Sequence, residues 1–471
     1  MPTDAPPPAR DPETPLERAI EAEICSGLPN EQKRLERDLR VLEYFNLEGH
    51  RHLPYEHECH RKTHPLTRRT IEILTSLTYS HPPTREILDD EESNALLTEV
   101  LKDNDADGLL DQADEMAMLL GLSAVYAAPT SDGLKPIKLY TYDGSQLATY
   151  ADPDDVTRIA HVVVISRHDE QTRYDWWSKD FRRVYVTAKA QTGYRTSGGR
   201  TARFREDLSH SNVVGRLPFA FFHARRPTGE ERCDGLGDWL ANYNCSIDHT
   251  LYEQALAVRH FYLPRAWVQN APADWQPTTS RDGEYMRLPE SMVSTSSPSV
   301  TASVGFLQAN LDIEQGVLNT ESLIETALAG IGVPKSLYSL DSASFASGDA
   351  ITAERQPLID RTLKRRQLLN ASETELAECI LAVAGAWYGI AEYKKAGLGG
   401  VNLAVRWPSL QSESELAAQD SKDLEQGVSS LVDVVQRRYG LSPEEALAHL
   451  VRVKEDSAKL AALGISTTTA V

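Results

Sequence analysis

The stretch KDNDADGLLDQADE, residues 102–115, has the residue types and the spacing of a calcium-binding loop. A hard cation needs carboxylates at loop positions 1, 3, 5, 9 and 12 and a glycine at position 6, where the chain turns sharply. The carboxylates here belong to Asp103, Asp105, Asp107, Asp111 and Asp114. Position 12 carries an aspartate instead of the longer bidentate glutamate, and the sequence has no second loop of this kind. The pattern therefore predicts a weak or incidental calcium site.

A second candidate for metal binding is the histidine-rich tract at residues 49–64. It holds five of the thirteen histidines and Cys59, and His60 and His64 are spaced as on one helix face. The tract lacks the paired ligand spacing of structural zinc sites and has no HExxH. Pro54 within it and Pro65 directly after it favour a loop. An exposed polar loop is the expectation, with a zinc site as the alternative.

Motifs for catalysis are absent from the sequence. It has no GxxxxGK[ST], GxGxxG, GxSxG or HExxH, so nothing in it indicates phosphate, dinucleotide or acyl-transfer chemistry. A pair of carboxylates for glycoside hydrolysis would be recognised by its spatial separation and not by a motif. We expect that the protein is not an enzyme.

The charge argues against a protein that grips nucleic acid. The 471 residues carry a formal charge of −20, and an acidic surface repels phosphate. The five cysteines are scattered, with no CxxC pair, which favours reduced thiols. The longest apolar run, residues 379–391, is too short to span a bilayer, so no membrane segment is expected. The start of the chain has six prolines in fifteen residues, which predicts a mobile tail over residues 1–30.

The elements that would position these residues follow from periodicity. Helical stripes at residues 35–42 and 71–77 precede a region of alternating apolar residues, about 139–224, which predicts an antiparallel sheet. One arm of this sheet, residues 179–205, has eight basic residues and one acidic residue. Its arginines are candidates for contact with DNA or the capsid, or they belong to a solvated hairpin. They include Arg182, Arg183, Arg200 and Arg203.

The second half of the sequence is mainly helical. Helices are expected at residues 236–263 and 312–332, separated by about fifty residues rich in Pro, Ser and Thr. A serine-rich loop then leads to a long helix from about Asp349, with Pro357 near its start. A short strand, VNLAVRW, precedes a helical C-terminus. The fold class that these elements predict is α+β, mainly α.

This order of elements, together with four short motifs, resembles the portal proteins of tailed bacteriophages. The stretches VLEYFNLEGHRHLP and DQADEMAMLLGLSAVYAAP are similar to early helices of that family. NVVGRLPFAFFHARRPTGEERCDGLGDWLANYNCSIDHTL is similar to its strand and first stem helix. In GIGVPKSLYSLDSASFASGDAITAERQPLIDRTLKRR, a SG-x-A sequence opens a long kinked helix, as in the family's tunnel loop.

The resemblance implies a portal-type fold with named parts. These are a mobile tail (1–30), a wing (31–235), a two-helix stem (236–263 and 312–332) around a clip (264–311), a tunnel loop (333–347), a long wing helix and strand (348–410) and a crown (411–471). It also implies that KDNDADGLLDQADE leads into a wing helix, about Leu109 to Leu120, which is capped by Asp107 and ended by Gly121.

The implied function is a ring of identical subunits, most often twelve in that family, at one capsid vertex of the virion, assembled in the host cytoplasm. Double-stranded DNA would pass through the ring's channel without sequence readout, during packaging and ejection. The expected partners are terminase, head-completion or adaptor proteins and the major capsid or scaffolding protein. The tunnel-loop residues expected near DNA are Lys335, Ser339, Ser342, Ser344, Phe345 and Ser347. The alternative is a calcium-dependent binding protein built on residues 103–114.

Overall fold

The computed structural model of the protein consists of two compact units. One contains residues 1–79 and 90–401, and the other contains residues 80–89 and 402–471. The structure describes residues 7–52, 62–88, 90–130, 137–168, 171–187, 202–262, 265–269, 286–287, 303–307, 313–338, 348–388, 400–408, 410, 420–439 and 443–462. Helices and strands mix in both units, which confirms the α+β class.

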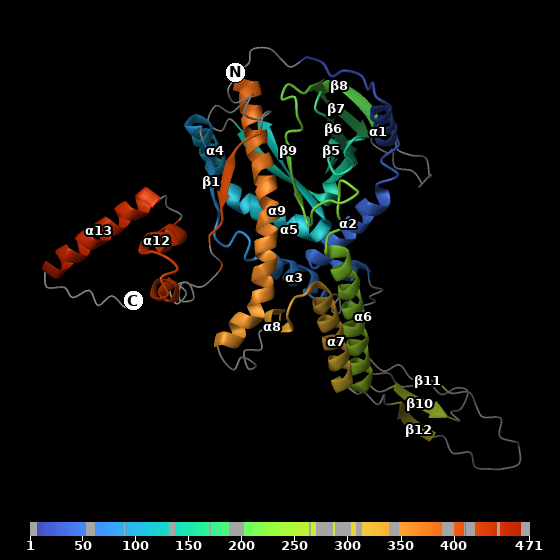
Figure 1. Cartoon of the computed structure of the whole chain (residues 1–471). Coiled ribbons are helices and arrows are strands. Elements are labelled where there is room, and N and C mark those ends of the chain that lie inside the picture. Colours follow the sequence, from blue (N-terminus) through green and yellow to red (C-terminus); the bar gives the residue numbers. More distant parts are fainter. Residues whose placement is uncertain are drawn as a thin grey trace, which may run out of the picture. The chain divides into compact units, whose positions relative to one another are not determined.

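The first unit contains most of the secondary structure (Figure 1). Its helices are α1 (Pro15–Cys25), α2 (Gln32–Phe45), η1 (Gly49–His52), α3 (Leu66–Thr75), α4 (Glu91–Asp103), α5 (Ala106–Leu120), η3 (Gly144–Gln146), α6 (Gly237–Tyr262), α7 (Ile313–Ile331), α8 (Lys335–Tyr338) and α9 (Gly348–Tyr388). Its strands are β2 (Leu122–Pro129), β3 (Ile137–Asp143), β4 (Leu147–Ala151), β5 (Ile159–His168), β6 (Gln171–Trp177), β7 (Phe181–Thr187), β8 (Ala202–Ser211), β9 (Phe219–His223), β10 (Arg265–Gln269), β11 (Met286–Arg287) and β12 (Ser303–Leu307).

The predicted antiparallel sheet is two sheets packed against each other. Strands β4 to β8 form one sheet in sequence order, and β2 lies between β3 and β9 in the other. Successive side chains of a strand point to opposite faces. On β5, Val162 and Val164 therefore pack against the three-stranded sheet, whereas Val163 and Ile165 face α1. Burial on both faces explains why the β5 sequence is a nearly continuous apolar run.

The prediction of a mobile tail over residues 1–30 is wrong for residues 7–30. Thr14 and Glu17 form a capping box at the start of α1, with Pro15 at the first helical position. Ile20, Ile24 and Leu28 are buried against the five-stranded sheet. A Pro-rich composition indicates a lack of helix, but this segment gains its stability from apolar side chains that the sheet covers.

The acidic stretch that resembles a calcium loop is mostly helical, so the predicted loop conformation is wrong. Helix α4 ends at Asp103, and α5 begins at Ala106 after Asp105, which has a left-handed backbone (φ 49°). The predicted end of α5 is confirmed: Gly121 has φ 94°, and a Cβ there would lie 1.9 Å from the carbonyl oxygen of Cys233. Burial of its apolar face stabilises α5 as a helix, since Leu110, Ala113 and Ala117 are fully buried.

The two helices predicted at residues 236–263 and 312–332 are confirmed as α6 and α7. They are antiparallel, since Trp239 donates to the carbonyl of Ala327 and Gln254 donates to the carbonyl of Gly316. The helices approach closely at the end of α7, where a Cβ on Gly330 would lie 2.8 Å from the Trp239 ring. Strands β10 to β12 lie between these helices in the sequence and form a small sheet of their own.

The second unit contains β1 (Thr84–Ile87), β13 (Leu403–Arg406), α12 (Leu431–Tyr439) and α13 (Pro443–Ala462). Strand β13 pairs with β1 in antiparallel register. This pairing changes two predicted boundaries. The C-terminal unit begins near residue 402 instead of 411, and it includes residues 80–89, which the prediction assigned to the wing.

A charged groove along the long helix, and its neighbours

The last aspartate of the acidic stretch has a partner inside the subunit. Asp114 has no exposed surface, and the guanidinium of Arg365 on α9 binds its Oδ1, with the Nε at 2.6 Å. Arg365 also donates to the carbonyls of His223 and Ala224 at the end of β9. One buried ion pair thus joins α5, α9 and β9. Among the described residues, no three His, Cys, Asp or Glu side chains form a group that could hold a metal ion.

The basic arm of the five-stranded sheet is largely bound within the subunit. Arg182 pairs with Asp175 at 2.9 Å and lies over the Trp177 ring. Arg183 is only 3% exposed and pairs with Asp11 and Glu21 of the N-terminal segment, so its prediction as an outward contact is wrong. Arg203 is exposed on β8, and Arg200 lies outside the described residues.

Of the predicted tunnel-loop residues, the structure describes only Lys335. It lies in α8 and pairs with Glu325 of α7, its Nζ 2.5 Å from the carboxylate. Ser339, Ser342, Ser344, Phe345 and Ser347 lie outside the described residues. Helix α9 begins at Gly348, directly after them, as predicted. Most of the histidine-rich tract, residues 53–61, is also outside the described part.

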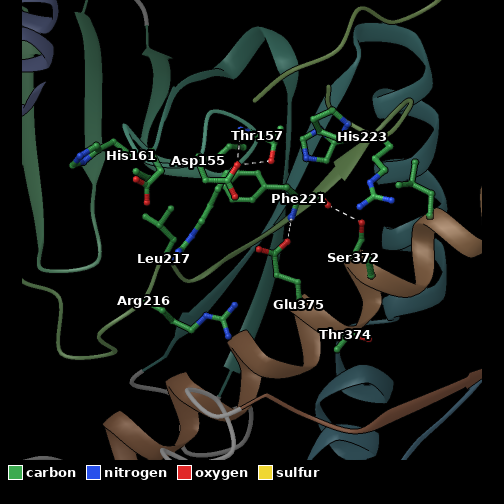
Figure 2. Close-up of a pocket in the computed structure, with 18 of the residues that line it drawn as sticks. Asp155, Thr157, His161, Arg216, Leu217, Phe221, His223, Ser372, Thr374 and Glu375 are labelled. Atoms are coloured by element: carbon green, nitrogen blue, oxygen red, sulfur yellow. Dashed lines mark hydrogen bonds between the residues drawn. The ribbon is translucent and has the colours of Figure 1, made fainter. Parts of the chain in front are cut away.

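Sequence reasoning missed a large groove beside α9. It has a volume of about 2260 Å³, and α9 forms one wall from Arg361 to Glu378. The opposite wall contains residues 152–158 with the start of β5, the start of α1 and the segment at residues 215–227. Figure 2 shows Ser372, Thr374 and Glu375 on the α9 side of this groove, with His161 and Asp155 across from them.

Side chains of α9 bind the free edge of strand β9 in this groove. The amide of Phe221 donates to Glu375 Oε2 at 2.9 Å, and the Ser372 hydroxyl donates to the carbonyl of Phe221 at 2.7 Å (Figure 2). An open sheet edge would otherwise expose unpaired backbone groups. Burial outweighs the Phe221 amide and the nearby Arg216 and raises the pKa of Glu375 to about 7. The carboxyl is therefore close to its titration point at neutral pH.

The two ends of the groove differ in charge. Near the N-terminal part of α9, the bonds of Arg365 to residues 223 and 224 bring Arg225 and Arg226 beside Arg361 and Lys364. Away from this end, acidic residues outnumber basic ones in the walls: Glu17, Asp152, Asp154, Asp155, Asp180, Glu375 and Glu378 occur there with Arg10, Arg158, Lys179 and Arg216. A helix rises ~1.5 Å per residue, so the two ends are ~25 Å apart along α9. No sequence pattern could have identified the groove, because its walls come from segments more than 350 residues apart.

Helices α6 and α7 leave several large apolar side chains in solvent. Trp239 of α6 is 45% exposed, and Val317 and Leu318 of α7 are 47% and 52% exposed. These side chains lie outside the buried core, which contains Leu240, Ile247 and Leu328 of the same helices. Within the described residues, no helix is both long and apolar enough to cross a membrane.

Comparison with known proteins places the chain in a family. The family model for phage portal proteins of the SPP1 Gp6-like type matches residues 30–432. No curated protein matches the chain. Among solved structures, a chain in the virion of a native gene transfer agent particle is 13% identical with a TM-score of 0.45, covering 86% of this chain and 94% of that one. A chain in the neck of the native particle, computed with C12 symmetry, is 12% identical with a TM-score of 0.42, covering 87% and 92%. Because the family model spans most of the sequence, the protein belongs to the SPP1 Gp6-like family of phage portal proteins.

Proposed function

We propose that the protein forms a closed ring, most simply of twelve subunits, at one vertex of a phage capsid. The observation that carries this proposal is the family match over residues 30–432. The ring is a structural conduit without catalytic activity. It is assembled in the host cytoplasm and becomes part of the virion.

The exposed apolar side chains of α6 and α7 support such an assembly. Burying apolar surface contributes ~25 cal/mol per Å², so Trp239, Val317 and Leu318 favour packing against a protein surface over contact with water. In a ring, the α6–α7 pair of one subunit lies between those of its two neighbours. We therefore assign α6 and α7 to the stem, residues 264–311 to the clip and the second unit to the crown.

We further propose that double-stranded DNA moves through the ring's channel in both packaging and ejection. The charge of −20 per subunit is repeated around the ring. Proteins that bind DNA tightly neutralise phosphates with many basic residues and release counterions. An acidic channel lacks this interaction, so DNA passes without being held. Residues 333–347 would form the tunnel loop, with small polar side chains that contact the backbone without reading bases.

The partners follow from the same position in the particle. A motor that supplies ATP energy, a terminase, would dock at the clip, because this sequence has no phosphate-binding loop of its own. Head-completion or adaptor proteins would bind the same end after packaging, and the major capsid or scaffolding protein would surround the wing.

Mass measurement tests the ring. Twelve subunits of 52.3 kDa give about 630 kDa, which light scattering or native mass spectrometry distinguishes from a monomer. A matched variant with Val317→Ser and Leu318→Ser removes exposed apolar side chains without altering the buried core, and we expect it to shift the distribution toward monomer. A wild-type protein that remains at 52.3 kDa at micromolar concentration would contradict the proposal.

A further inference from the structure

The basic end of the groove has more positive charge than its own subunit neutralises. Arg226 and Lys364 are exposed, and Arg225 lies beside them. Burial and the neighbouring Arg365 both lower the pKa of Arg361, so this guanidinium gains no stabilisation from an acid. Asp114, the buried acid of this region, is already bound to Arg365. An anionic partner would relieve the repulsion at this end of the groove.

The corner between α4 and α5 has an excess of negative charge. Residues 91–115 contain nine acidic residues and one basic residue, Lys102. Glu92, Glu99 and Asp111 are exposed there. Burial, together with Glu72 and Asp111, outweighs the nearby Arg68 and raises the pKa of Glu115 to about 7. Glu92, Glu99 and Asp111 lie at the surface of the corner, where an outside cation can reach them.

The two patches lie on different sides of one subunit. Helix α4 packs against α9, and Figure 1 shows it on the opposite side of α9 from strand β5, which borders the groove. A ring of identical subunits needs two different, complementary patches on each subunit, because each contact is head-to-tail. The size also fits. A two-turn helical segment occupies ~1000 Å³ with its side chains, which is less than the 2260 Å³ of the groove.

We propose that the α4–α5 corner of one subunit docks into the basic end of the groove of the next subunit, with its acids facing Arg226 and Lys364. This inference rests on the proposed ring, and it gives the acidic stretch a role as half of an interface. The acidic loop at residues 152–155, at the other end of the groove, would repel the corner and so fixes the end at which it docks.

Charge reversal on each patch tests the pairing. The groove variant is Arg226→Glu with Lys364→Glu, and the corner variant is Glu99→Lys with Asp111→Lys. We expect each purified variant to stay monomeric under conditions in which the wild type forms rings. Mixing the two should restore rings in which the variants alternate, because an intact corner meets an intact groove at one interface and a reversed corner meets a reversed groove at the next. Combining all four substitutions in one chain should restore rings.

A control and several outcomes separate this inference from the ring itself. Arg167→Glu with Arg203→Glu reverses two exposed arginines outside the groove, and we expect rings as in the wild type. Circular dichroism and thermal unfolding verify that each variant is folded. If a reversal does not fold, Arg226→Gln with Lys364→Gln replaces it and should shift ring formation to higher protein concentration. Rings formed equally well by the groove variant, or no complex on mixing, would overturn the docking but not the ring. A wild type without rings would overturn the proposed function.

Discussion

Removing Asp114 should destabilise the protein far more than removing its neighbour Asp111. Asp114 is fully buried and is the ion-pair partner of Arg365, which is 8% exposed. Breaking a buried pair by deleting one partner costs ~3–5 kcal/mol, because the other charge stays buried without compensation. Asp111 lies at the surface of the same helix, where partial burial of its carboxyl and the nearby Asp114 already raise its pKa. Its replacement by Ala should change the free energy of unfolding by ~0.5 kcal/mol or less.

Urea unfolding followed by tryptophan fluorescence measures both substitutions. Asp114→Ala should lower the midpoint strongly, whereas Asp111→Ala should leave it nearly unchanged or raise it slightly. In the double variant Asp114→Leu with Arg365→Leu, no charge remains buried. The double variant should therefore lose less free energy of unfolding than Asp114→Ala. Some loss remains, because the carbonyls of His223 and Ala224 lose a donor at a cost of ~1–3 kcal/mol. Equal effects of Asp114→Ala and Asp111→Ala would refute this account of the junction between α5, α9 and β9.

Three further predictions concern pH, the N-terminal segment and calcium. The pKa of Glu375 is raised in the folded protein, so its contribution to stability is present below about pH 4.5 and is lost as the pH rises through about 7. The free energy of unfolding of the wild type should therefore decline by up to ~3 kcal/mol over this range. Glu375→Gln should flatten this decline in unfolding curves measured from pH 5 to 8. Ile24→Ala should lower the free energy of unfolding in urea by ~2–5 kcal/mol, because Ile24 is fully buried. Arg18→Ala, on the exposed face of α1, is the control and should have almost no effect. Equal losses in the two variants would show that α1 does not pack as described. Calorimetry should detect no calcium binding at residues 103–114, since these carboxylates lie along helices; a sub-millimolar site that Asp103→Ala abolishes would restore the loop interpretation.

Local signals predicted the helical framework well. The periodicity of residues 236–263 and 312–332 and the glycine at position 121 are properties of single segments, and the structure places α6, α7 and the end of α5 there. The sequence Thr14-Pro-Leu-Glu17 was also readable as a capping box with proline at the first helical position. The proline count of the whole segment obscured it, because composition averages over the residues that start a helix.

The groove and the buried ion pair could not be predicted, because they depend on contacts across long stretches of sequence. Asp114 and Arg365 are 251 residues apart, and a carboxylate at that position is equally suited to a cation or to an arginine. The aspartates of residues 103–114 do have the spacing of a calcium-binding loop, but that spacing alone does not determine the backbone conformation. The apolar residues Leu110, Ala113 and Ala117 decide the conformation, since burying them requires a helix.

Electron microscopy of the purified wild-type protein tests the central claim most directly. Class averages seen along the symmetry axis should show closed rings of identical subunits, with a central channel wide enough for double-stranded DNA. Twelvefold symmetry is the expected result. A field of single particles without rings at micromolar concentration, for a protein that circular dichroism shows to be folded, would contradict the account.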